Sequence, residues 1–164
     1  MAARENFEKT LTELQDKMTE MSDLTVTALD KAFCALKTQN IELALEVIEE
    51  DSAIDILETD INNFIVWLIA KEQPVARDLR RIVGALKISL EIERIADFAV
   101  NIAKATIRIG KVESMLSSTK LEEMKDLAIE MLQKAVKSFI DENMSLAKEV
   151  GDLDDQVDDL CDIN

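Results

Sequence analysis

The scarcity of helix-breaking residues constrains this chain more than any other feature of its sequence. Its 164 residues include three glycines and one proline. Sandwiches, barrels and βαβ folds need many turns, and turns depend heavily on these two residue types. The apolar residues are mostly Leu, Ile, Ala, Val and Met, which suit the packing of one helix on another. The sequence therefore predicts an all-α fold.

Five helical segments follow from the three- and four-residue spacing of the apolar side chains. Pro74 separates the second segment from the third, because its ring favours a turn or a helix start. The segments are expected at residues 5–36, 41–71, 75–109, 121–140 and 143–164, with a linker at 111–119. Their expected core stripes are Leu11, Leu14, Met18, Met21, Thr25, Leu29, Ala32 and Leu36 in the first, Ile54, Leu57, Ile61, Phe64 and Leu68 in the second, and Ile88, Ile92, Ile95, Ala99 and Ile102 in the third.

An internal repeat relates the second segment to the fifth. The run NIELALEVIEEDSAIDIL begins at Asn40 and aligns with NMSLAKEVGDLDDQVDDL, which begins at Asn143, an offset of 103 residues. We therefore expect two tandem three-helix bundles, the first complete over residues 1–112 and the second incomplete over 113–164. An unfinished bundle has an apolar stripe left to bury, which favours self-association as a homodimer.

Charge and composition exclude several classes of function. The net charge of −15 argues against nucleic-acid binding, which needs a basic surface. The absence of His removes Ser-His-Asp and Cys-His catalysis. No signal sequence is evident, and the longest apolar run covers residues 64–70, whereas a membrane-spanning helix needs about 20 residues. Cys34 and Cys161 share no motif spacing, which is typical of free thiols, and Cys34 is expected to be buried. A cytoplasmic protein without membrane insertion is expected.

Acidic residues gather in two stretches of the chain. Residues 42–60 contain eight acids and no base, and residues 141–162 contain nine acids and one base. Residues 71–111 contain nine bases and five acids, so one interpretation is that the basic third helix balances the acidic second helix. Such charge runs are also typical of solvated helix faces. Bases near the start of the third helix are expected to pair with the second helix or to contact an acidic partner or phosphate, namely Arg77, Arg80 and Arg81.

A sharper interpretation follows if the second and third helices fold back on each other at Pro74. Asp55 and Glu93 each lie 19 residues from Pro74, and Asp51 and Asp97 each lie 23 residues from it. Every α-helix has the same rise per residue, so residues equally far from the turn lie side by side across an antiparallel pair. Asp55 would therefore lie beside Glu93, and Asp51 beside Asp97. The spacing of four residues within each helix places its two acids on one face. Four carboxylates would then meet at one level of the hairpin.

Clustered carboxylates repel one another unless protons or cations neutralise them. Glu58 and Asn62 extend the acidic stripe on the second helix, and Asn101 extends it on the third. The stripe lies beside the core face of each helix, so the expected site is a surface patch rather than a buried cavity. The candidate ions are cations that prefer oxygen ligands, namely Mg, Mn, Ca or iron. Zinc is also a candidate, although the chain has no His for the usual zinc sites.

The residues around Pro74 also resemble a known family. The runs QPVARDLR from Gln73 and LEIERIAD from Leu90, followed by Asn101-Ile102-Ala103, resemble the signature of the PhoU family. The second-helix run Asp51-Ser52-Ala53-Ile54-Asp55 also matches it. Ala96 stands where the family usually has Gly, which is a mild change because Ala favours helix. The resemblance spans essentially the whole chain.

This resemblance implies a fold, a site and a function. PhoU proteins consist of two homologous three-helix bundles and bind multinuclear metal clusters, iron in particular, through acidic pairs separated by three residues. The matching pairs here are Asp51 with Asp55, Glu93 with Asp97, and Asp154 with Asp158 in the second unit. The family represses phosphate uptake and the phosphate-starvation response. It acts with a phosphate ABC transporter and a sensor histidine kinase, and it is regulatory rather than enzymatic.

Two other classes of function remain open at this point. A purely structural helical adaptor would use its acids only for solubility. A carboxylate di-metal oxidase of the ferritin-like class would need a buried site and His ligands, and the chain has no His.

Overall fold

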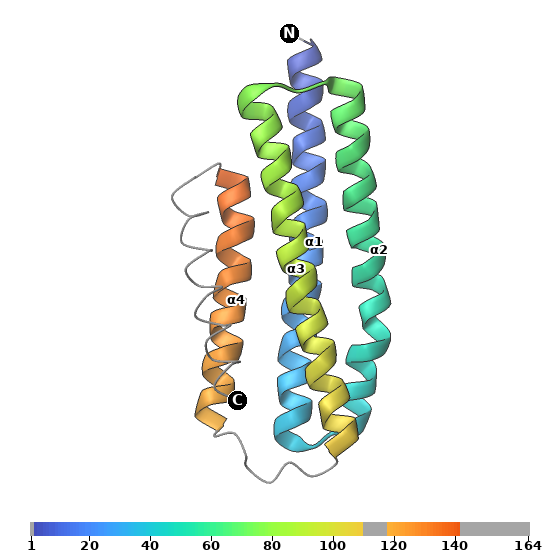
Figure 1. Ribbon diagram of the computed structural model, residues 1–164, viewed down its shortest axis with the longest axis vertical. Helices are drawn as coiled ribbons and strands as arrows, with labels where there is room; N and C mark the ends of the chain where they lie inside the picture. The colour runs from blue at the N-terminus through green and yellow to red at the C-terminus, as the bar shows by residue number, and fades with distance from the viewer. Residues whose placement is uncertain (1, 110–117, 142–164) are drawn as a thin grey trace.

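The computed structural model describes residues 2–109 and 118–141 (Figure 1). These residues form four helices and no strand: α1 (Ala2–Thr38), α2 (Ile41–Glu72), α3 (Ala76–Ile109) and α4 (Ser118–Asp141). The all-α prediction is confirmed, and the four helix boundaries lie within three residues of those expected. Ser118 and Thr119, expected in the linker, belong to α4. The fifth predicted helix lies outside the described residues.

The turns that join α1 to α2 and α2 to α3 contain no glycine. Asn40 caps the start of α2, where its side-chain Oδ1 accepts a hydrogen bond of 3.1 Å from the amide of Leu43. Gln39 and Gln73 end the preceding helices with left-handed backbone conformations, at φ 57° and 44°. Gln73 donates its amide to the carbonyl of Ile69, which satisfies one of the last carbonyls of α2. The predicted turn at Pro74 is confirmed, since α2 and α3 are joined by three residues.

The first three helices run antiparallel in sequence order and pack around one core (Figure 1). α4 packs against α1 and α3 and lies across α3 from α2 in Figure 1. α3 therefore contacts each of the other three helices. None of the four described helices combines the length and the apolarity needed to cross a bilayer.

The core follows the expected stripe of α1 closely. Every predicted position of that stripe is buried, and Leu14, Met18 and Met21 have no exposed surface. Buried Thr25 satisfies its hydroxyl by donating to the carbonyl of Met21 at 2.8 Å. The predicted stripe of α3 is partly correct, because Ile88 and Ile102 are half-buried. Ile92, Ile95 and Ala99 are buried as predicted, and small residues outside the predicted stripe fill much of the rest of the centre, namely Ala85, Ser89, Ala96 and Ala103.

Acids of α2 form ion pairs with lysines of α1. Lys17 Nζ lies 2.6 Å from Asp60 Oδ2, and Lys31 Nζ lies within 3.1 Å of Glu46 and Glu50. These side chains are at least a quarter exposed, apart from Lys17 at 24%, so each pair contributes little stability alone, on the order of 0–1 kcal/mol. Together they neutralise part of the acidic helix on the side that faces α1.

Two side chains differ from expectation. Cys34 is exposed, not buried, because it lies on the outer side of α1 between the core residues Phe33 and Ala35. Arg81 pairs with Glu8 of α1 and with Asp78 of its own helix, at 3.5 and 3.6 Å, two partners that the sequence did not predict.

Candidate functional site

The α2–α3 hairpin carries five acids on facing stripes, which we call the acidic cluster. Asp51, Asp55 and Glu58 come from α2, and Glu93 and Asp97 come from α3. Asp55 and Asp97 are exposed, whereas Asp51, Glu58 and Glu93 are half-buried. The expected surface patch is therefore a partly sheltered face between two helices. Because the connection at Pro74 is short, it sets the register that brings together acids 35 or more residues apart in sequence.

Glu58 is the most strongly perturbed member of the acidic cluster. Burial raises its pKa to about 7, assisted by a hydrogen bond with the carboxyl of Glu93 and by repulsion from Glu93, Asp55 and Asp97. A carboxyl with this pKa carries a proton for part of the time at neutral pH. The protonated group donates the hydrogen that two carboxylates share, which lowers the repulsion between the helices.

Asp51 and Asp97 are perturbed in the same direction. Burial raises the pKa of Asp51, and repulsion from Asp55, Asp97 and Glu93 adds to this effect. Asp97 is exposed as a residue, but partial desolvation of its carboxyl raises its pKa, followed by repulsion from Glu93 and Asp55. Lys104 opposes both shifts, because its positive charge favours the ionised carboxylates. Five acids thus interact electrostatically across the two helices, with one lysine as a partial counter-charge.

Two oxygen atoms beside the acidic cluster are buried without a hydrogen-bond partner in the described part of the chain. They are Oδ1 of Asp51 and Oδ1 of Asn62, which lie three helical turns apart along α2. A buried acceptor without a donor costs free energy, about 1–3 kcal/mol for a neutral group. An oxygen-preferring cation would satisfy such acceptors and offset the excess negative charge, so the donor chemistry fits hard metal ions.

The acidic cluster is not a preformed ligand cage. Among residues 5–108 and 120–141, no three His, Cys, Asp or Glu side chains converge closely enough to hold a metal ion. Mutual repulsion spreads carboxylates that lack a cation, and the side chains of Asp and Glu reach different positions by rotation about their χ angles. Metal binding at the acidic cluster therefore stays a prediction that depends on a small rearrangement.

The remaining predicted site residues have different outcomes. Asn101 lies exposed on α3, one helical turn beyond Asp97. Asp154 and Asp158 lie outside the described residues. Asn62 was predicted on the acidic stripe but not among the ligands, and the sequence interpretation missed Lys104 as a counter-charge. Lys104 follows Asp97 by seven residues, which is two helical turns on the same face, and this spacing is the signal that could have found it.

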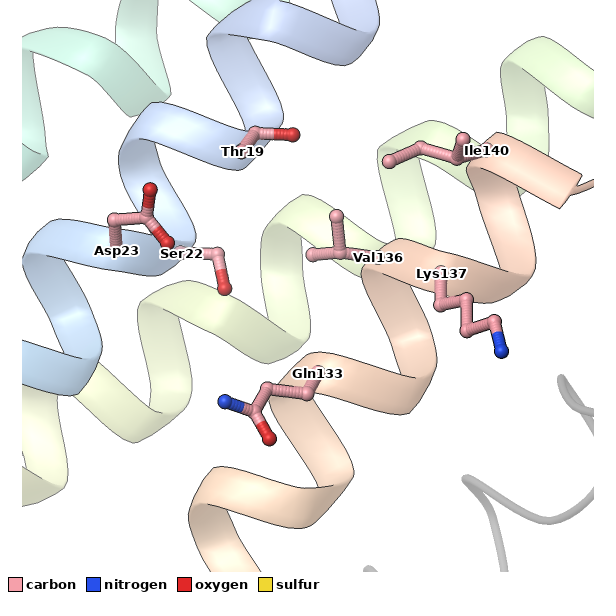
Figure 2. Close-up of a pocket in the computed structure, with 7 residues that line it drawn as sticks. All are labelled: Thr19, Ser22, Asp23, Gln133, Val136, Lys137 and Ile140. Carbon is pink, nitrogen blue, oxygen red and sulfur yellow. The ribbon is translucent and has the colours of Figure 1, made fainter.

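A separate hollow of roughly 240 Å³ lies between α1 and α4 (Figure 2). None of its lining residues belongs to the acidic cluster, so this hollow does not extend the site. The residues that line it are Thr19, Ser22, Asp23, Gln133, Val136, Lys137 and Ile140.

The pKa of Glu58 predicts the pH dependence of the metal-free protein. Its folded-state pKa of about 7 lies above the ordinary value of 4.5, so the folded state holds more protons than the unfolded state between these values. The contribution of Glu58 to stability is therefore present at low pH and is lost as pH rises through about 7. Glu58→Gln, which cannot ionise, should raise the melting temperature by about 2–4 °C at pH 8 in the presence of a chelator.

The measurement is calorimetry of both proteins across the pH range. The difference between wild type and Glu58→Gln should shrink as pH falls to about 5, because wild-type Glu58 is then protonated in the fold. A difference that does not change with pH would contradict the raised pKa of Glu58. Glu49→Gln, at an exposed position elsewhere on α2, is the matched control and should show no such trend.

The described residues thus define an all-α antiparallel bundle that carries acidic pairs on two facing helices. Within that class the family is clear. A family model described as the PhoU domain matches residues 18–106 and 121–163. The chain belongs to the PhoU family.

Individual relatives agree with this assignment. The chain is 41% identical over 152 residues to the phosphate-specific transport system accessory protein PhoU homolog of Aquifex aeolicus, a match that covers 93% of this chain and 69% of the relative. It is 33% identical to PhoU homolog 1 of Thermotoga maritima, with coverages of 94% and 67%. The crystal structure of PhoU from Pseudomonas aeruginosa superposes with a TM-score of 0.82 at 28% identity, covering 94% of this chain and 74% of that one. The Streptococcus pneumoniae phosphate transport system regulatory protein PhoU gives 0.79 at 27% identity, with coverages of 94% and 72%.

Proposed function

We propose that this chain regulates phosphate transport, lowering phosphate uptake and repressing the phosphate-starvation response when phosphate is plentiful. The observation that carries this proposal is the similarity to proteins named as accessory or regulatory components of phosphate transport, at up to 41% identity among those compared. The bundle acts by binding other proteins rather than by catalysing a reaction.

The acidic cluster is the proposed cation site of this regulator. Asp51, Asp55, Glu58, Glu93 and Asp97 would supply carboxylate oxygens, and the partnerless Oδ1 of Asp51 supports this role. A bound cation would supply positive charge between α2 and α3 where the acids otherwise repel each other. Iron, Mg, Mn, Ca and Zn remain the candidate ions. Asn101, and Asp154 with Asp158 in the second unit, are further proposed ligands.

The proposed partners are the components of a phosphate ABC transporter and a sensor histidine kinase, met in the cytoplasm by a homodimer of this chain. The support is that the relatives are named as accessory proteins of phosphate transport. The acidic surface also suits protein partners with basic surfaces better than it suits nucleic acid.

Complementation tests the proposal. The chain is expressed in a bacterium that lacks its own PhoU relative, and uptake of radioactive phosphate is measured in phosphate-rich medium. We expect uptake to fall several-fold relative to an empty vector. Unchanged uptake, with the chain present at levels comparable to the native relative, would contradict the regulatory role and leave a structural adaptor as the better description.

A further inference from the structure

An apolar strip continues the acidic cluster along the outer face of the α2–α3 hairpin, toward the connection at Pro74. We call it the apolar strip; it consists of Val66 and Ile69 from α2 and of Leu79, Val83 and Leu90 from α3. All five side chains are exposed, and Val66 and Leu90 are the most exposed, at 67% and 50%. Isolated exposed apolar residues are common, so their significance depends on whether they form one surface.

Helix geometry places these residues together. Val66 follows Asp55, and Ile69 follows Glu58, by 11 residues, or three helical turns, so both lie on the face of α2 that carries the acids. Across the hairpin, Ile69 lies level with Leu79, and Val66 lies within one residue of the level of Val83. Leu90 is level with Glu58 and joins the apolar strip to the acidic cluster.

The charges beside the apolar strip are one-sided. Residues 61–70 of α2 contain no charged side chain. On α3, by contrast, exposed Arg80 and Lys87 follow one another at a spacing of seven residues, which keeps them on one side of the helix. A neutral side and a basic side therefore flank an apolar strip, although the chain as a whole has a net charge of −15.

We infer that the apolar strip is a docking surface for an amphipathic helix of a partner protein whose apolar face is bordered by acidic residues. A shallow surface between two antiparallel helices accepts a third helix, with anchors at helical spacing. Arg80 and Lys87 would pair with the acids and fix the orientation of the helix. This inference rests on the proposed function, because it names the chemistry of the partner that such a regulator meets.

Charge complementarity favours this occupant over a second copy of the chain. A two-fold arrangement through the apolar strip would set it against the same uncharged stretch of α2 or against the same bases of α3. An arrangement centred on Val66 and Val83 brings the acidic cluster of neither copy to Arg80 and Lys87, because that cluster begins at the level of Leu90. An anionic membrane would satisfy the bases, and the experiment below includes it as a separate arm.

The test uses the full chain and two designed helical peptides, with Leu at positions i, i+3, i+4 and i+7 and either Glu or Lys along one border. Binding is followed by fluorescence anisotropy of labelled peptide. We expect the Glu peptide to bind at least about tenfold more tightly than the Lys peptide. Arg80→Glu with Lys87→Glu should reverse this preference. Val66→Asn with Val83→Asn should weaken binding of the Glu peptide about tenfold.

Matched controls separate docking from general effects. Leu24→Asn with Ile56→Asn changes two exposed apolar residues elsewhere and should leave peptide binding unchanged. Circular dichroism checks that every variant is folded. Equal affinity for the two peptides, or peptide binding that the Val66 and Val83 changes do not weaken, would overturn the docking surface.

Two further outcomes would assign the apolar strip to another occupant and so overturn the inference. One is binding to phosphatidylglycerol vesicles that exceeds peptide binding and is lost in the Arg80 and Lys87 variant. The other is dissociation of a dimer by the Val66 and Val83 changes in sedimentation experiments. Failure of these peptide experiments leaves the proposed function standing if phosphate uptake still falls, whereas unchanged uptake contradicts that function whatever the peptides do.

Discussion

Removing one acid from each side of the hairpin, as Asp55→Asn with Glu93→Gln, is expected to abolish stabilisation by metal ions. A cation that binds only the folded state, at a free concentration a hundred times its dissociation constant, raises the free energy of unfolding by about 2.7 kcal/mol. For a chain of this size this corresponds to a rise of about 5–10 °C in melting temperature. Wild-type protein titrated with Fe, Mn or Mg after chelator treatment should show this rise, and the double variant should not.

The metal-free double variant should behave in the opposite way. It removes two of the charges that repel one another, so its melting temperature without metal should equal or exceed that of the wild type. Glu49→Gln with Glu123→Gln removes the same net charge at exposed positions outside the acidic cluster and should keep the metal response. Elemental analysis of the purified proteins gives an independent measure. Equal metal content and equal stabilisation in wild type and double variant would end the proposal of a cation site.

The largest loss of stability is expected from Ile61→Ala in the centre of α2. Ile61 has no exposed surface and belongs to the core. Truncation of a buried Ile to Ala costs about 2–5 kcal/mol, through lost burial and the cavity left behind. Urea denaturation should show this as a lower transition midpoint with an unchanged slope.

The matched control for Ile61 lies on the same helix. Ile56 is 70% exposed, so Ile56→Ala removes little buried surface and should change stability by no more than about 0.5 kcal/mol. Ala also has a higher helix propensity than Ile, which offsets part of any loss. Similar destabilisation by both changes would contradict the burial pattern of α2.

The helices and their order were predictable because local signals agree with the fold. In α1, the three- and four-residue spacing of apolar side chains correctly identifies the buried face. Asn40 and Pro74 mark helix boundaries, Asn40 by capping α2 and Pro74 by the geometry of its ring. The core face of α3 was less predictable. Small residues occupy many of its central positions, so Ala85, Ser89 and Ala103 are buried although a search for large apolar residues passes over them.

The acidic cluster was predictable in position but not in its protonation. Counting residues from Pro74 was sufficient to bring Asp51, Asp55, Glu93 and Asp97 to one level. Sequence could not show that Glu58 has the highest pKa of the group, because that depends on its burial and its hydrogen bond with Glu93. The apolar strip was also missed, since Val66, Val83 and Leu90 form one surface only after both helices are placed.

The short connections between the first three helices have a consequence for folding during synthesis in the cell. Two residues join α1 to α2 and three join α2 to α3, and helical bundles with such local contacts fold within milliseconds or faster. A further 55 residues follow Ile109, and a ribosome adds about 5–20 residues per second, so several seconds pass before they are made. The nascent chain thus has time to close the hairpin, and to encounter cations, before translation reaches the end of the sequence.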